Sequence, residues 1–152
     1  YKQVELGFNY RMTDFQAALG ISQLENLEPF IEKRQQIANR YNERFQHLPV
    51  KLPLKNNQST SSLHLYPVQV DPKARRAIFD HLKSKDIGVN VHYIPIHLQP
   101  YFRAFGFKTG DFPNAEQYYS SAISLPIFPS LKLAEQDKVI SELIFAIDAS
   151  MR

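Results

Sequence analysis

The chain has 152 residues, of which 43% are hydrophobic and 22% are charged, a balance typical of a globular domain large enough to bury a core. Cysteine is absent, which excludes a disulfide framework and a thiolate metal site, and the net charge of +3 comes without a basic run, which disfavours nucleic-acid binding. No run approaches the roughly 20 apolar residues that cross a bilayer, and no secretory leader is seen, so we expect a cytoplasmic protein without a membrane partner. Because the chain begins with Tyr1 rather than Met, we expect a fragment of a longer protein.

The first predicted helix follows the stretch GFNYRMTDFQAALG, residues 7–20. Thr13 and Gln16 have the spacing of a capping box, in which each side chain binds a backbone N–H at the helix start. Apolar residues then fall on almost every side of the helix: Phe15, Ala17, Ala18, Leu19, Ile21, Leu24 and Leu27. Such a helix is buried on several sides, so we expect residues 15–27 to pack into another subunit or a separate domain.

A second, long amphipathic helix is predicted from Glu28–Pro29, where proline suits a first turn, to Leu48. Its apolar residues recur at helical spacing: Phe30, Ile37, Tyr41, Phe45 and Leu48. A polar loop follows over residues 51–62. We therefore expect residues 1–48 to form interface or connecting helices and residues 49–152 to form a small α/β domain.

The remainder alternates between strands and helices. Strands are predicted over residues 63–70, 88–93 and 123–125. One helix is predicted to begin after Asp71, with Asp71 as its N-cap and Pro72 at its first position. A short helical turn is predicted at 100–105, and further helices are predicted over 114–122 and about 133–147. Three strands with helices on one side predict an α/β (α+β) fold in two layers.

The turn before the first helix is a candidate anion site. A helix N-terminus offers unpaired N–H groups and partial positive charge. Asn9 adds an amide, Arg11 adds a guanidinium fork, and Gly7 lets the backbone approach closely. The residues alone favour a simpler interpretation, in which the helix is capped and Arg11 packs along its surface.

A second candidate site lies in HYIPIHLQPYF, residues 92–102. His92, Tyr93 and His97 would supply imidazole and hydroxyl hydrogen bonds to a polar ligand such as a sugar, in the kind of loop that commonly carries function. The alternative is an aromatic loop packed around its prolines. The two histidines are five residues apart, which suits no standard metal pair, so no metal site is expected. No lysine falls in a predicted apolar pocket, where imine chemistry would be favoured, so no catalytic residue is assigned on this chain.

Three stretches together carry a resemblance to a known family: GFNYRMTDFQAALGISQLENLEPFIEKR, HYIPIHLQPYF and SLPIFPSLKLAEQDKVI. In this order they resemble the C-terminal part of the DegT/StrS-type nucleotide-sugar aminotransferases, which use pyridoxal 5'-phosphate. The opening stretch is most similar to the branch that makes 4-amino sugars on UDP carriers, as in pseudaminic acid synthesis. The resemblance covers nearly the whole chain.

The resemblance implies the small C-terminal domain of the aspartate-aminotransferase (type I PLP-transferase) fold, with a three-stranded, mainly antiparallel sheet covered by helices and preceded by two long helices. It also implies a homodimer. Asn9 would bind the cofactor phosphate across the dimer interface, and Arg11 would hold an anionic ligand or shape that interface. Tyr93, His97 and His92 match the segment that lines the nucleotide-sugar pocket.

The same resemblance places the Schiff-base lysine in a large domain upstream of residue 1, so this chain alone is expected to be inactive. The parent enzyme is expected to move an amino group, from glutamate, to a nucleotide-linked 4-keto-6-deoxy sugar for bacterial surface polysaccharide or glycan synthesis. Two alternatives stay open: a related pyridoxal-phosphate-dependent sugar dehydratase, and a non-catalytic binding domain that kept the substrate pocket.

Overall fold

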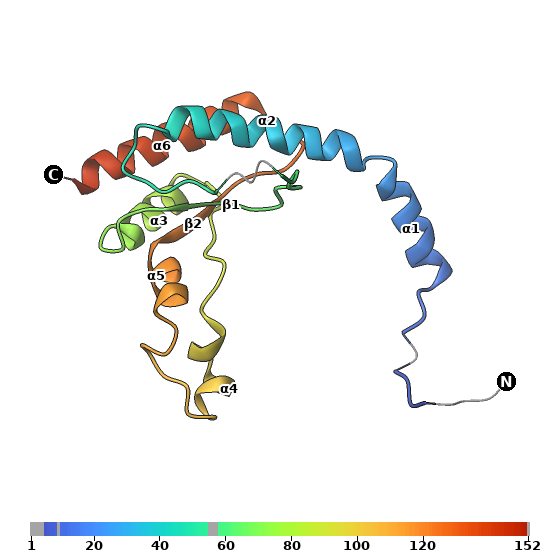
Figure 1. Ribbon diagram of the computed structural model, residues 1–152. Helices are drawn as coiled ribbons and strands as arrows, with labels where there is room; N and C mark the ends of the chain where they lie inside the picture. Colours follow the sequence, from blue (N-terminus) through green and yellow to red (C-terminus); the bar gives the residue numbers. More distant parts are fainter. Residues whose placement is uncertain (1–4, 9, 55–57, 152) are drawn as a thin grey trace.

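A computed structural model describes residues 5–8, 10–54 and 58–151 of the chain. Two long helices come first, and a small α/β unit follows (Figure 1). The elements in chain order are α1 (Asp14–Leu24), α2 (Leu27–Phe45), β1 (Tyr66–Gln69), α3 (Arg75–Ser84), the 3-10 turn η1 (Ile96–Leu98), α4 (Pro100–Arg103), α5 (Pro113–Ser121), β2 (Ala122–Leu125) and α6 (Leu133–Ser150). In Figure 1, α2 and α6 run along one side of the strand pair, while α1 and the arm that carries α4 and α5 extend away from it.

Helix α1 begins as the sequence predicts. The Gln16 backbone N–H donates to Thr13 Oγ1 at 3.3 Å, and the Thr13 backbone N–H donates to Gln16 Oε1 at 2.9 Å. No residue of α1 is buried, and Phe15 and Leu24 are 86% and 67% exposed. The apolar residues of α1, which we expected to pack against another subunit or a separate domain, are therefore not buried by the rest of this chain.

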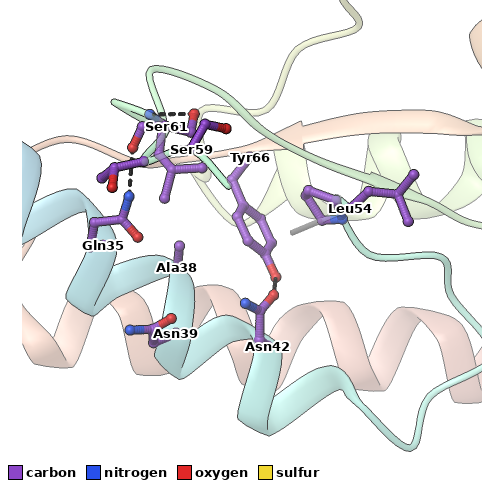
Figure 2. Close-up of a pocket in the computed structure, with 11 residues that line it drawn as sticks. Gln35, Ala38, Asn39, Asn42, Leu54, Ser59, Ser61 and Tyr66 are labelled. Atoms are coloured by element: carbon purple, nitrogen blue, oxygen red, sulfur yellow. Dashed lines mark hydrogen bonds between the residues drawn. The ribbon is translucent and has the colours of Figure 1, made fainter. Parts of the chain in front are cut away.

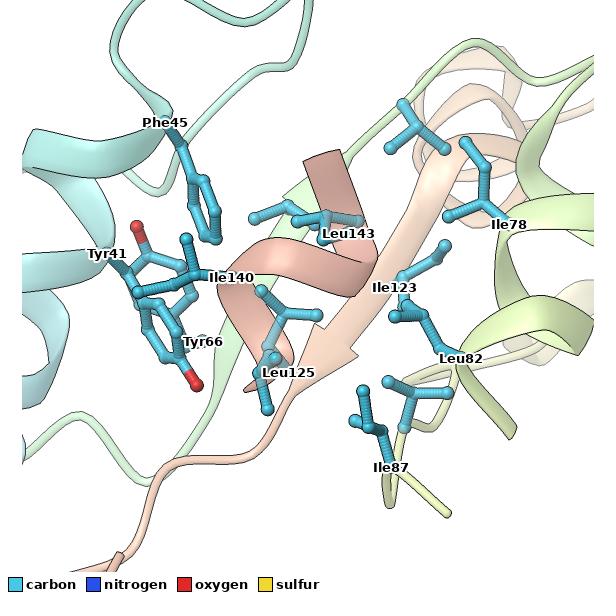
Figure 3. Packing of buried hydrophobic residues seen from close by; sticks show 14 of the residues in the cluster. Tyr41, Phe45, Tyr66, Ile78, Leu82, Ile87, Ile123, Leu125, Ile140 and Leu143 are labelled. Carbon is cyan, nitrogen blue, oxygen red and sulfur yellow. The ribbon is translucent and has the colours of Figure 1, made fainter. Parts of the chain in front are cut away.

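The hydrophobic core lies between α2, α6, the strand pair and α3 (Figure 3). Helix α2 contributes only its C-terminal half, because its buried residues are Ile37, Ala38, Tyr41 and Phe45. Helix α6 lies against this half through Gln136, whose amide donates to the Ile37 carbonyl at 2.8 Å in the buried interior. Pairing of this kind satisfies a polar group that would otherwise cost free energy to bury.

Two buried tyrosines near α2 use their hydroxyl groups in hydrogen bonds at the edge of the core. Tyr41 donates to the Pro126 carbonyl at 3.0 Å, and Tyr66 donates to Asn42 Oδ1 at 2.6 Å. Burial raises the pKa of both phenols above the ordinary value, because a phenolate would lose its hydration there. Both side chains therefore act as neutral hydrogen-bond donors.

The sheet has two strands rather than the three expected. β1 and β2 are antiparallel, with Tyr66 opposite Leu125 and Gln69 opposite Ala122. In the described structure, the backbone of the predicted strand over 88–93 pairs with β2 through an isolated bridge between Asn90 and Ser124. Asn90 and Ser124 exchange both of their backbone N–H···O bonds, so the next bonded pairs along an antiparallel ladder would be Gly88 with Pro126 and His92 with Ala122. Pro126 has no N–H to donate, and the Ala122 N–H donates instead to the Tyr118 carbonyl at the end of α5, so the pairing does not extend.

The start of α3 also differs from the prediction. Asp71 closes a turn before the helix, accepting from the Lys73 N–H on Oδ1 and from the Arg75 N–H on its carbonyl, both at 2.9 Å. Arg75 is the first helical residue, so Pro72 lies in this turn rather than at the first helical position. Helices α4, α5 and α6 lie where the sequence predicts them, within a few residues. In the described part of the chain, no helix is long and apolar enough to cross a membrane.

Candidate functional site

The first candidate segment is the turn before α1. Asn9, the expected phosphate ligand, lies outside the described residues. Arg11 is exposed and lines a shallow hollow with Tyr10, Met12, Thr13 and Gln16. The guanidinium therefore stands open beside a capped helix N-terminus, where an anion is favoured. Its role in binding stays a prediction.

The second candidate segment follows the Asn90 bridge. His92 is half-buried, and its Nδ1 lies 2.9 Å from Ser124 Oγ on β2. The Tyr93 ring meets the His92 ring edge-on, with centroids 4.7 Å apart, and Tyr93 is 70% exposed. The structure thus brings these two predicted site residues together, with β2 fixing the imidazole and the phenol open to a ligand.

His97 binds a different partner. It is 6% exposed, and its Nε2 lies 2.8 Å from Glu116 Oε1 at the start of α5. The same carboxylate oxygen accepts the Gly110 backbone N–H at 2.7 Å. The hydrogen bond from His97, and then the one from Gly110, lower the pKa of Glu116, because both favour the charged carboxylate. One carboxylate therefore joins the His97 loop to the loop before α5.

Glu116 is a residue that the sequence analysis did not assign to a site. It lies in the first turn of α5, where the helix dipole favours any acidic group. It lies 19 residues from His97, and that spacing has no periodic meaning. The available signal was His97 itself, an imidazole among apolar neighbours that needs a hydrogen-bond partner when buried.

A cavity of about 430 Å³ opens beside His97. It is lined by Pro95, Ile96, His97, Phe102, Phe107, Phe112 and Ala115. Phe112 lies against the His97 ring, with centroids 4.8 Å apart. Figure 1 shows this arm, which carries α4 and α5, on the opposite side of the molecule from α1. Within one chain, the two candidate segments are therefore separate.

A smaller and more polar pocket, of about 190 Å³, lies between α2 and the loop before β1 (Figure 2). Asn39 and Asn42 line it from α2, and Tyr66 lines it from β1. The Gln35 amide donates to the Ser61 carbonyl, so the loop is tied to the helix. Since the Tyr66 hydroxyl already donates to Asn42, the polar groups here hold the fold together.

Every lysine in the described part of the chain is exposed. The imine that pyridoxal phosphate forms with its enzyme needs a lysine amine held in a sheltered site. No lysine in the described part of the chain is held in such a site. The described residues also contain no cluster of three or more His, Asp or Glu that could hold a metal ion.

The chain is similar to several curated proteins. It is 40% identical over 148 residues to the spore coat polysaccharide biosynthesis protein SpsC of Bacillus subtilis, covering 92% of this chain and 38% of that protein. It is 34% identical over 148 residues to a UDP-4-amino-4,6-dideoxy-N-acetyl-beta-L-altrosamine transaminase of Campylobacter jejuni, covering 95% of this chain and 39% of that protein. The chain thus spans about two fifths of the length of these curated relatives.

Solved structures share the fold. Helicobacter pylori PseC, an aminotransferase involved in the biosynthesis of pseudoaminic acid, matches with a TM-score of 0.87 and 28% identity, over 97% of this chain and 41% of PseC. A putative sugar aminotransferase of Streptococcus pneumoniae, Spr1654, matches in its PLP form with a TM-score of 0.86 and 28% identity, over 91% of this chain and 36% of that protein. The expected aminotransferase fold is confirmed, with two strands in place of three.

Spr1654 is solved in both a PLP and a PMP form, so pyridoxal phosphate is the cofactor of the group to which these structures belong. Residues 1–144 match the DegT/DnrJ/EryC1/StrS aminotransferase family. This match covers nearly the whole chain and agrees with the relatives and with the fold. The chain belongs to the DegT/DnrJ/EryC1/StrS aminotransferase family.

Proposed function

We propose that this chain is the C-terminal part of a pyridoxal-phosphate-dependent aminotransferase that moves an amino group, from glutamate, to a 4-keto-6-deoxy sugar carried on a nucleotide. The observation that carries the proposal is the family match over residues 1–144. The relatives add support for a sugar substrate, since one is named as a UDP-aminosugar transaminase. In this proposal residues 1–48 connect to a large cofactor domain upstream, and two copies form a homodimer.

The chain contributes binding groups to this reaction. Asn9 and Arg11 are proposed to hold anionic groups of the cofactor or substrate at the turn before α1, where the exposed Arg11 guanidinium suits a phosphate. Tyr93 and His92 are proposed to bind the sugar, since the phenol is open and the imidazole is fixed by Ser124. His97 is proposed to contact the nucleotide-sugar substrate from the arm that carries α4.

Bound pyridoxal phosphate supplies an electron sink for breaking a C–H bond beside nitrogen. The described lysines are all exposed and provide no sheltered amine for it. We therefore propose that the amine comes from the upstream domain and that this chain alone does not transfer amino groups. The bare apolar face of α1 is consistent with packing against that domain or a second subunit.

The test is an amino-transfer assay on the full-length protein with isotopically labelled glutamate and a UDP-4-keto-6-deoxy sugar. The expected result is labelled nitrogen in the sugar product, measured by mass spectrometry, and no product from the 152-residue chain alone. If the product is a dehydrated sugar that carries no labelled nitrogen, the full-length protein is a dehydratase and the proposed amino transfer is wrong. Failure to convert any nucleotide-linked keto sugar, in a preparation that binds pyridoxal phosphate, would refute it.

A further experiment tests the missing lysine on the chain itself. Pyridoxal phosphate is added, the mixture is reduced with borohydride, and peptides are mapped by mass spectrometry. No saturable adduct is expected, because exposed lysines react weakly and without preference. Clean labelling of one lysine would show that this chain holds the cofactor amine after all.

A further inference from the structure

A further pocket, of about 380 Å³, lies between the turn that follows α3, the loop that follows β2, and the start of α6. We call it the α3–α6 pocket. Its volume falls within the roughly 300–1,000 Å³ range of small-molecule pockets. Most of its lining is apolar: Ile87, Pro126, Phe128, Leu131 and Val139. Among the described residues, none of those assigned above to cofactor or sugar binding lines it.

The apolar lining combines a fixed floor with an open ring. Ile87 and Val139 are buried members of the hydrophobic core, so the floor is held in place by the packing of the domain. Phe128 is 43% exposed, which leaves one phenyl ring half-open beside that floor. Such a ring offers a large apolar surface, and an aromatic partner packs on it particularly well. The lining therefore favours a ligand with a large apolar group.

Three charged side chains also line the α3–α6 pocket: Asp86, Glu135 and Lys138. All three are exposed, and none of them forms an ion pair within the described part of the chain. One carboxylate oxygen of Glu135 accepts the Lys132 backbone N–H at 2.8 Å, which fixes this side chain at the start of α6. The pocket thus combines an apolar floor with two carboxylates and one ammonium group that have no ion-pair partner.

Asp86 occupies a backbone position where glycine is the usual residue. Helix α3 ends in a Schellman motif, in which the Ile87 N–H donates to the Leu82 carbonyl and the Asp86 N–H donates to the Lys83 carbonyl, both at 3.1 Å. Asp86 has a φ of 57° there, a left-handed conformation that costs aspartate free energy and costs glycine none. A strained residue that replaces glycine at such a turn points to a use for its side chain.

We infer that the α3–α6 pocket binds a free amino acid with a large apolar side chain. The side chain packs on Phe128, the α-ammonium group pairs with Asp86 and Glu135, and the α-carboxylate pairs with Lys138. An amino acid fits because it carries both charges at one end of an apolar body, as the lining requires. The inference goes beyond the proposed function and does not depend on it.

The first experiment compares three ligands on the full-length protein by ligand-observed NMR titration. L-Phenylalanine is expected to bind with a Kd of roughly 1 mM. 3-Phenylpropanoate lacks the ammonium group and brings a negative charge to two carboxylates, so it is expected to bind about fivefold more weakly. Phenethylamine lacks the carboxylate and is expected to bind about twofold more weakly. Equal binding of the three, or no binding of phenylalanine, would overturn the inference.

A substitution at Gly88 tests whether the ligand occupies this pocket. Gly88 lines it, and a Cβ at this position would meet nothing within 4 Å apart from its chain neighbours. Gly88→Val therefore fills part of the pocket without displacing the protein, and it is expected to abolish phenylalanine binding. Unchanged binding by this variant would show that phenylalanine binds elsewhere on the protein, and the inference would be wrong.

Two substitutions remove one charge each. Asp86→Asn keeps a residue type that tolerates the left-handed conformation, and it is expected to weaken phenylalanine binding about threefold. Lys138→Gln is expected to weaken phenylalanine by a similar factor and not to weaken phenethylamine, which has no carboxylate. Lys73→Gln, at an exposed lysine before α3, makes the same change of charge away from the pocket and is the control, expected to alter neither ligand.

Asp86→Gly separates binding from folding. Glycine removes both the carboxylate and the backbone strain, so phenylalanine binding is expected to weaken while the urea midpoint of unfolding does not fall. Phenylalanine affinity that stays the same in this variant and in Asp86→Asn would show that Asp86 has no part in a ligand site, and it would overturn the inference.

Discussion

Replacing Leu143 by Ala tests the packing of α6 on the core. Leu143 is 0% exposed, and Figure 3 shows it within the cluster formed with β2 and α3. Truncating a fully buried leucine costs the transfer free energy of the lost methyl groups plus the cavity they leave, about 3 kcal/mol with a range of roughly 2.7–5. The whole free energy of unfolding of such a domain is about 5–15 kcal/mol, so the change is a large share of it.

Leu133→Ala is the matched control, because it makes the same substitution on the same helix where the side chain is 65% exposed. Because its side chain is already largely in solvent, the control is expected to stay within about 0.5 kcal/mol of the wild-type chain. The assay is urea unfolding followed by circular dichroism, with the slope of free energy against urea compared among the three proteins. Equal costs at the two positions, or a cost below about 1 kcal/mol at Leu143, would show that α6 does not pack as described.

Three further predictions concern other parts of the molecule. The pKa of Glu116 is lowered in the folded chain, so its contribution to stability is present above the unfolded carboxyl pKa of about 4.3 and is lost as pH falls through the lower folded value. Glu116→Gln should remove that acid-dependent loss from unfolding curves recorded across this range, and an unchanged pH profile would count against the pairing. Tyr66→Phe deletes a buried hydroxyl donor and should cost about 1–2 kcal/mol of unfolding free energy, whereas Tyr93→Phe, at an exposed ring, should cost almost nothing. Replacing Phe15 and Leu24 by Ser should lower the average mass measured by light scattering at high concentration, since both lie on the bare face of α1; wild-type chain that stays monomeric there would contradict this.

Local patterns in the sequence predicted the local features of the fold. The Thr13 and Gln16 capping box needs only three residues of spacing, and the structure has it. The apolar residues of α6 recur at the helical period over several turns, so the pattern was enough to predict this helix. The third strand was predicted from alternation, which cannot show that the pairing would stop where Pro126 has no N–H and where the Ala122 N–H donates to the end of α5.

The candidate site was less predictable, because its contacts are not local. His92 and Tyr93 adjoin in sequence and stay together in the fold. The pairing of His97 with Glu116 depends on the path of the intervening loop, which no periodicity describes. The aromatic cavity likewise combines residues from η1, α4 and α5, and only the fold brings them together.

Helix α2 gives the molecule a gradient of local stability. Its 19 residues extend about 28 Å at the helical rise, yet its buried residues begin only at Ile37. Backbone amides near Phe45 should exchange with deuterium only when the whole domain unfolds, while those in α1 should exchange through fraying. Slow amide exchange in α1 would therefore appear only when another domain or subunit covers this helix. The rate of deuterium uptake at each residue of α1 and α2 thus shows which part of the two helices such a partner covers.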